Sequence, residues 1–107
     1  MDDIFPPSER DRLQRVLAVW KPRSAWLFGS RAKNVAGSES DVDLLIIDER
    51  AGGEQGIEID ISCDLMPRRY HLDILAYKPE YFAGELAQAE SFTNSILKSA
   101  ELLYERS

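Results

Sequence analysis

The segment from Asp41 to Asp48 places the strongest constraint on how this 107-residue chain can fold. Its sequence, DVDLLIID, begins with two acids at alternating positions and continues as an unbroken apolar run. A run of this length is typical of a central strand that is buried on both faces. Asp41 and Asp43 are two residues apart, so on a strand both carboxylates leave the same face of the sheet. The segment therefore predicts a buried strand that carries a pair of acids at its first and third positions.

The rest of the chain can be divided into helices and strands around this segment. Helical spacing after the N-cap candidate Ser8 predicts a helix over about 9–20, which Pro22 stops. The apolar run 24–28 predicts a strand that ends at Gly29, and residues 30–40 are compatible with one or two helical turns followed by a loop. Residues 69–77 again alternate like a strand, whereas 79–88 and 91–99 predict helices before the tail LLYER.

The stretch 57–66 is ambiguous. Its apolar residues alternate as in a strand, but Ile57, Ile61 and Leu65 also keep helical spacing. We favour a helix, because a connection back to a neighbouring strand usually carries one. The resulting order predicts the α/β (α+β) class, with a small mixed sheet of three or more strands and flanking helices, in one domain spanning residues 1–107.

Composition excludes several classes of protein. No apolar run reaches the 18 residues of a membrane span, and the acidic start MDDIFPPSER is unlike a signal peptide, so we expect a cytoplasmic protein without a membrane partner. One cysteine, Cys63, and one histidine, His71, cannot form a Cys/His zinc site. A net charge of −6 argues against general nucleic-acid binding.

The negative charge is concentrated in one block. Residues 39–64 hold nine acids and a single base, Arg50, so this segment carries −8 and the remainder of the chain +2. An acidic block in an otherwise balanced chain suggests bound cations. We interpret Glu54, Glu58, Asp60 and Asp64 as a solvated face. Cys63, Trp20 and Trp26 are interpreted as core residues.

Two groups of residues in and around this block could carry chemistry. Asp41 and Asp43 would repel each other unless a divalent cation neutralised them, and hard oxygen ligands suit Mg²⁺. An EF-hand is excluded, because Leu45 and Ile46 occupy positions where that loop needs ligands or glycine. Asp73 would supply a third carboxylate for a two-metal site if its strand lies beside that of Asp41 and Asp43. His71 lies on the same side as Asp73 by alternation, although a lone histidine there is more often a packing or surface residue.

The second group could bind an anion. The Gly29-Ser30 turn lets backbone N–H groups approach a phosphate, and Ser30 adds a hydroxyl donor. The alternative for Ser30 is a helix cap, which is itself compatible with phosphate binding. Arg31 and Lys33 are the nearest cations, as consistent with solvated charges as with ligand contacts. An anion cradle beside a metal site is typical of metal–nucleotide binding.

With these residues, the chain resembles a known family. The pattern GS at 29–30, SDVDLLI at 40–46 and HLDIL at 71–75 is similar to the minimal nucleotidyltransferases (MNT) of the DNA polymerase beta superfamily. One departure is Asn34, where family members commonly have glycine; asparagine tolerates the left-handed region, so the turn can survive.

The resemblance implies a nucleotidyltransferase that uses two Mg²⁺ ions, with Mn²⁺ as an alternative, and ATP or another NTP. Asp41, Asp43 and Asp73 would be catalytic metal ligands, and Gly29, Ser30, Arg31 and Lys33 would bind the nucleotide. Such short domains often accompany a helical HEPN protein, which they adenylylate as the antitoxin of a type VII-like toxin–antitoxin pair; homo-oligomers and hetero-oligomers are both compatible. The alternative is a non-catalytic antitoxin-like subunit that neutralises its partner by docking.

Overall fold

The computed structural model describes residues 7–28, 41–52, 54, 56–68 and 71–106, with the side chains of all of these except residues 7–9 and 41. Four strands form one mixed sheet in the order β3-β2-β1-β4. Its strands are β1 (Ser24–Phe28), β2 (Asp41–Ile47), β3 (His71–Tyr77) and β4 (Glu101–Glu105). Strand β1 pairs antiparallel with β2 and β4, whereas β2 and β3 run parallel. The expected small mixed sheet is confirmed.

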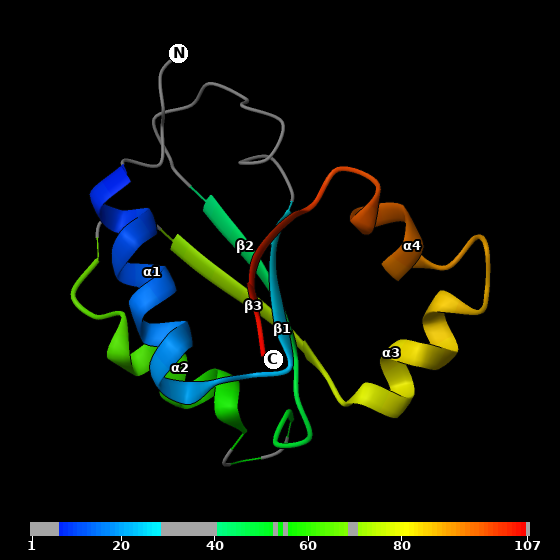
Figure 1. The fold of residues 1–107 in the computed structure, drawn as a ribbon, viewed down its shortest axis with the longest axis horizontal. Helices are drawn as coiled ribbons and strands as arrows, with labels where there is room; N and C mark the ends of the chain where they lie inside the picture. Colours follow the sequence, from blue (N-terminus) through cyan, green and yellow to red (C-terminus); the bar gives the residue numbers. More distant parts are fainter. Residues whose placement is uncertain (1–6, 29–40, 53, 55, 69–70, 107) are drawn as a thin grey trace.

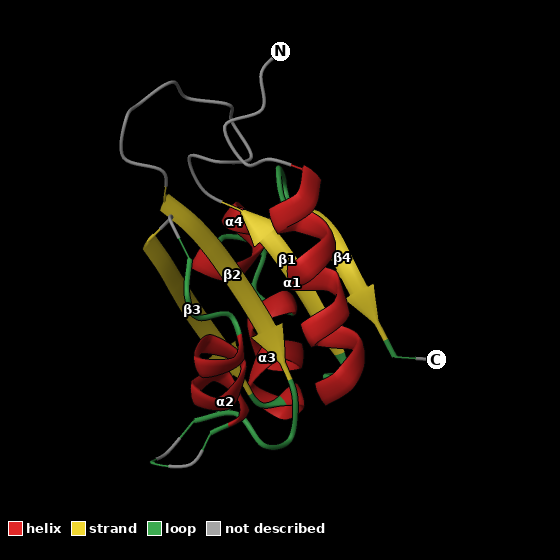
Figure 2. Cartoon of the chain, turned by 90° about the vertical axis from the view of Figure 1, so that its left-hand side faces the viewer, coloured by secondary structure: helices red, strands yellow, loops and turns green. Residues whose placement is uncertain are grey.

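Helices cover both sides of this sheet. Helices α1 (Pro7–Trp20) and α2 (Ile57–Asp64) lie on one side, and α3 (Pro79–Leu86) and α4 (Phe92–Leu97) lie on the other (Figures 1 and 2). The predicted helix over 57–66 is confirmed, because a parallel β2–β3 pair needs a crossover connection and α2 supplies it. None of the described helices is long and apolar enough to cross a membrane.

The main core lies between the sheet and the α1/α2 layer. Alternate residues of β2, namely Val42, Leu44 and Ile46, are buried in it together with Leu72 of β3. Helices α1 and α2 contribute buried leucines and isoleucines at helical spacing: Leu13, Leu17, Ile57 and Ile61. Leu45 and Ile47 alternate with the core residues and are buried as well, so β2 is covered on both faces, as its continuous apolar run predicts.

Three local predictions have clear outcomes. Ser91 caps α4, since its hydroxyl oxygen accepts a hydrogen bond from the Asn94 backbone N–H at 3.0 Å. Cys63 is exposed, so its interpretation as a core residue is wrong. The cause is the helical period of α2, which turns Ile57 and Ile61 inward and leaves Cys63, two residues after Ile61, outside. Trp20 packs partly buried against the core and donates its indole N–H to Asp64 at 2.7 Å.

Candidate active site

The first residues of β2 and β3 lie side by side because the two strands are parallel and in register. Asp41 pairs with His71, and Asp43 pairs with Asp73. Register partners on parallel strands project to the same face of a sheet. Val42 and Leu72 face the α1/α2 core, so Asp43 and Asp73 lie on the opposite face. Strand β3, which carries Asp73, therefore lies directly beside β2. The prediction of a third carboxylate depended on this arrangement.

The end of β1 reaches the same edge of the sheet. Phe28, its last residue, pairs with Asp43 on the other side of β2. The tip of β1 and the starts of β2 and β3 consequently share one edge (Figure 2). The predicted nucleotide-binding residues follow directly after Phe28, but they lie outside the described residues: Gly29, Ser30, Arg31 and Lys33.

The edge is accessible to solvent at β3. The Asp73 side chain is 63% exposed, that of His71 is 69% exposed, and Asp43 is half-buried. The Nδ1 atom of His71 lies 3.6 Å from Oδ2 of Asp73. His71 therefore approaches the predicted site from the side that strand alternation indicated.

The donor chemistry at this edge fits a hard divalent cation. Asp43 and Asp73 supply carboxylates from neighbouring strands, and Asp41 is two positions before Asp43 in the same strand. Carboxylate oxygens are the ligands that Mg²⁺ prefers, and a cation offsets the repulsion between like charges on paired strands. Among the described side chains, which exclude that of Asp41, no group of three or more His, Cys, Asp or Glu residues is arranged as a complete metal site. The predicted ligand set also includes Asp41.

Comparison with known proteins identifies the family. The family model described as "Polymerase beta, Nucleotidyltransferase" matches residues 12–107, which is nearly the whole chain. The chain belongs to the polymerase beta nucleotidyltransferase family. Its general function is nucleotidyl transfer.

A solved structure supports the fold of this nucleotidyltransferase domain. It is a protein from Sulfolobus solfataricus, itself assigned as a nucleotidyltransferase, with a TM-score of 0.51 and 16% sequence identity. The match covers 92% of this chain and 86% of the other. No curated protein matches the sequence.

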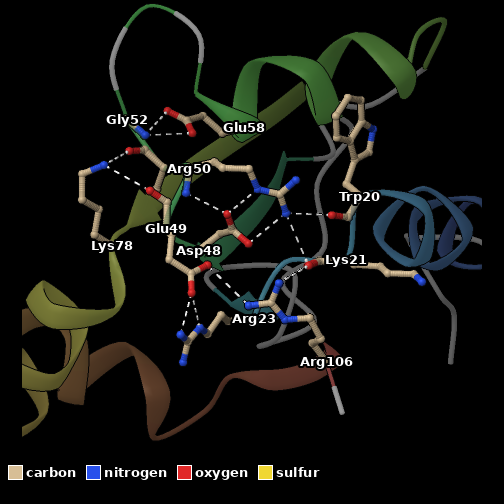
Figure 3. Close-up of polar contacts among 11 residues, drawn as sticks. Trp20, Lys21, Arg23, Asp48, Glu49, Arg50, Gly52, Glu58, Lys78 and Arg106 are labelled. Carbon is tan, nitrogen blue, oxygen red and sulfur yellow. Dashed lines mark hydrogen bonds and ion pairs between the residues drawn. The ribbon is translucent and has the colours of Figure 1, made fainter.

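The opposite end of the nucleotidyltransferase sheet is held by a polar network centred on Asp48 (Figure 3). The Asp48 carboxylate is fully buried and accepts hydrogen bonds from Arg50 Nε at 2.7 Å, Arg50 Nη2 at 3.0 Å and the Arg50 backbone N–H at 2.8 Å. Arg50 Nη2 also donates to the carbonyl of Trp20 at 2.8 Å, at the end of α1. This pair therefore links the end of β2 to the end of α1.

Further contacts extend the network to the other elements. Glu49 accepts a hydrogen bond from Arg23 Nε at 2.7 Å and contacts Arg106 at 3.4 Å, which connects the ends of β1, β2 and β4. Lys78 donates to the carbonyls of Glu49 at 3.2 Å and Ala51 at 3.1 Å, at the junction of β3 and α3. The network thus joins the far ends of all four strands.

The Asp48–Arg50 pair also perturbs the ionisation of both groups. Burial acts to raise the pKa of Asp48, but hydrogen bonds and charge attraction from Arg50 outweigh it and hold that pKa below its usual value. The hydrogen bond to Asp48 raises the pKa of Arg50 in turn. Part of the acidic block is therefore structural, which the sequence reasoning missed. The available signal was an acid at the end of an apolar strand with an arginine two residues later.

The other acids of the block that the structure describes lie in α2 and in the loop before it. Glu54, Asp60 and Asp64 are exposed, as expected of a solvated face, and Glu58 accepts hydrogen bonds from the Gly52 backbone N–H at 3.1 Å. These residues belong to α2 and the loop before it, on the layer opposite the face of Asp43 and Asp73.

Proposed function

We propose that this domain transfers AMP from ATP to a hydroxyl acceptor in a reaction that requires Mg²⁺. The observation that carries the proposal is the register pairing of Asp43 with Asp73 beside the end of β1. It gives the family's two acidic motifs a common edge of the sheet, next to the point where the glycine-serine segment begins. Asp41 and Asp43 would bind the metal ions, and Asp73 would be the third carboxylate ligand.

The residues of the chain have separate roles in this reaction. Ser30 and the backbone N–H groups after Gly29 would bind the β- and γ-phosphates, with Arg31 and Lys33 adding positive charge. Asp73 would accept the proton of the acceptor hydroxyl, because its carboxylate is exposed to an incoming substrate. Bound Mg²⁺ supplies charge that stabilises the entering and leaving oxygens. The acceptor oxygen forms a bond to the α-phosphorus, the bond to the bridging oxygen breaks, and pyrophosphate leaves.

We further propose that the acceptor belongs to a helical HEPN partner, as in a type VII-like toxin–antitoxin pair. The described surface supports a protein partner, because α3 has no buried residue and the α3/α4 layer exposes large apolar side chains. Phe92 is 61% exposed, Tyr81 55% and Leu86 41%. An apolar surface of this kind is typical of a protein-binding face.

The test is a transfer assay with the purified domain, Mg²⁺, each of the four NTPs and the helical protein encoded by the neighbouring gene. Intact-mass spectrometry should detect one added nucleoside monophosphate on the partner with ATP. Asp43→Asn and Asp73→Asn should remove transfer. Asp60→Asn, which changes the same charge on exposed α2, should retain it.

Two results would contradict the proposal in different ways. A stable complex with the partner but no transfer with any NTP would favour the non-catalytic docking subunit. Transfer to a small-molecule hydroxyl, with none to the partner, would retain the chemistry and remove the HEPN acceptor.

A further inference from the structure

His71 occupies a position from which it can reach the cation of the proposed active site. It is the first residue of β3, the register partner of Asp41, and two residues before Asp73 on the same face of the strand. The Asp41 and Asp43 positions of β2 and the His71 and Asp73 positions of β3 therefore form two facing pairs. Three of these positions are the acids already assigned to metal binding, and the fourth is an imidazole.

The side chains of His71 and Asp73 lie close enough for both to reach one ion after a rotation. Nδ1 of His71 and Oδ2 of Asp73 are 3.6 Å apart. Two ligands that are each about 2.1 Å from one octahedral ion are about 3.0 Å apart when adjacent and about 4.2 Å apart when opposite. The observed distance exceeds the adjacent value by about 0.6 Å. A small rotation of either exposed side chain would bring both donors into one coordination shell.

We propose that the imidazole of His71 is a direct ligand of the divalent cation bound by the aspartates. This inference rests on the proposed function, because it concerns the same site. An imidazole nitrogen is a softer donor than a carboxylate oxygen and suits transition metals, whereas Mg²⁺ prefers oxygen ligands and retained waters. A mixed nitrogen and oxygen donor set consequently binds Mn²⁺ in preference to Mg²⁺.

The composition of the chain makes the proposal directly testable by spectroscopy. His71 is the only histidine in the sequence, so any imidazole nitrogen coupled to bound Mn²⁺ must come from it. The experiment is pulsed electron paramagnetic resonance of the full chain with Mn²⁺, without nucleotide. We expect ¹⁴N modulation in the wild type and its replacement by the ¹⁵N pattern after ¹⁵N-histidine labelling. His71→Gln, at a side chain that is 69% exposed, should fold normally and lose the modulation.

Affinity measurements separate a ligand from a positioning residue. In His71→Gln, Mn²⁺ affinity should fall about tenfold or more, while Mg²⁺ affinity should change less than about threefold. Equal losses for the two ions would overturn the proposal, because they would indicate that His71 only orients Asp73 through their contact. Asp60→Asn is the matched surface control and should leave both affinities unchanged.

The same titration distinguishes failure of this inference from failure of the proposed function. Free Mn²⁺ has a sharp resonance, so its loss counts the bound ions independently of their ligands. Bound Mn²⁺ that is released by Asp43→Asn but shows no ¹⁴N modulation would overturn the role of His71 and leave the carboxylate site intact. No bound Mn²⁺ in the wild type would overturn the metal site and this inference together.

Discussion

Asp43 and Asp73 are register partners on two parallel strands, although they are thirty residues apart in the sequence. Their pairing depends on the β2–α2–β3 crossover, which returns the chain to the same edge of the sheet. Like charges on directly paired positions of neighbouring strands destabilise a sheet. The arrangement is therefore suited to a cation, whose binding should be measurable as stabilisation of the folded chain.

Mg²⁺ should raise the thermal unfolding midpoint of the wild type and not that of Asp73→Asn. At ten times the dissociation constant, binding to the folded state alone adds about 1.4 kcal/mol, or about 5–10 °C for a domain of this size. Because Asp73 is exposed, the variant should match the wild type in the absence of metal within about 0.5 kcal/mol. Differential scanning calorimetry with and without Mg²⁺ checks this. Asp60→Asn should retain the full shift, and an equal shift in Asp73→Asn would exclude Asp73 as a ligand.

The pairing of Asp43 with Asp73 could be anticipated only in part from the sequence. Alternation indicates which face each acid takes, because the strand period is local. The relative register of two parallel strands is not local, since it depends on the course of the crossover connection that contains α2 and on how that helix packs against the sheet. The same limit applies to Asp48. Its apolar neighbours identify the strand, but its partner Arg50 also donates to the Trp20 carbonyl at the end of α1, a contact between distant parts of the chain.

Strand β4 is an edge strand that is difficult to predict from the sequence. The tail contains two adjacent leucines between charged residues, without the alternation that identifies a strand. Its conformation depends on β1, which pairs with it across a register shift between Ala25 and Trp26. Of the two leucines, Leu103 is buried and Leu102 is 42% exposed. Strand alternation places adjacent leucines on opposite faces, but the sequence cannot tell which of the two faces the core, because their side chains are chemically identical.

These leucines provide a matched test of β4. Leu103→Ala should destabilise the fold by about 2–3 kcal/mol through lost burial and the resulting cavity. Leu102→Ala should cost less than about 1 kcal/mol, because much of its side chain is already in water. Chemical denaturation of the two variants checks the difference. Equal losses would contradict the assignment of Leu103 to the core face.

Removing Arg50 should destabilise the chain more than its exposed position suggests. Arg50→Ala leaves the Asp48 carboxylate buried with one backbone N–H donor in place of three donors. Breaking a buried ion pair typically costs about 3–5 kcal/mol, and the 49% exposure of the Arg50 side chain reduces our expectation to about 2–3 kcal/mol.

Urea denaturation measures this loss at neutral pH. Arg15→Ala removes an exposed arginine from α1 and is the control, with an expected change within about 0.5 kcal/mol. Similar losses of unfolding free energy in the two variants would show that the contact between Arg50 and the buried Asp48 carboxylate contributes little to stability.

The effect of Arg50→Ala should shrink as the pH falls. In the wild type the pKa of Asp48 lies below its ordinary value of 3.8, so the stability that its ionised form contributes is present above that pH. This contribution is lost as the pH falls through the lowered pKa of the folded state. Without Arg50, burial would act with less opposition and raise the pKa of Asp48, so protonation would favour the folded variant. The difference in unfolding free energy between the wild type and Arg50→Ala should therefore become smaller between neutral pH and about pH 3.

Other acids, including Glu49 with its own lowered pKa beside Arg23, are common to both proteins and largely cancel in the comparison. Urea denaturation at a series of pH values gives this difference, and a gap that stayed constant would show that Asp48 does not titrate against Arg50.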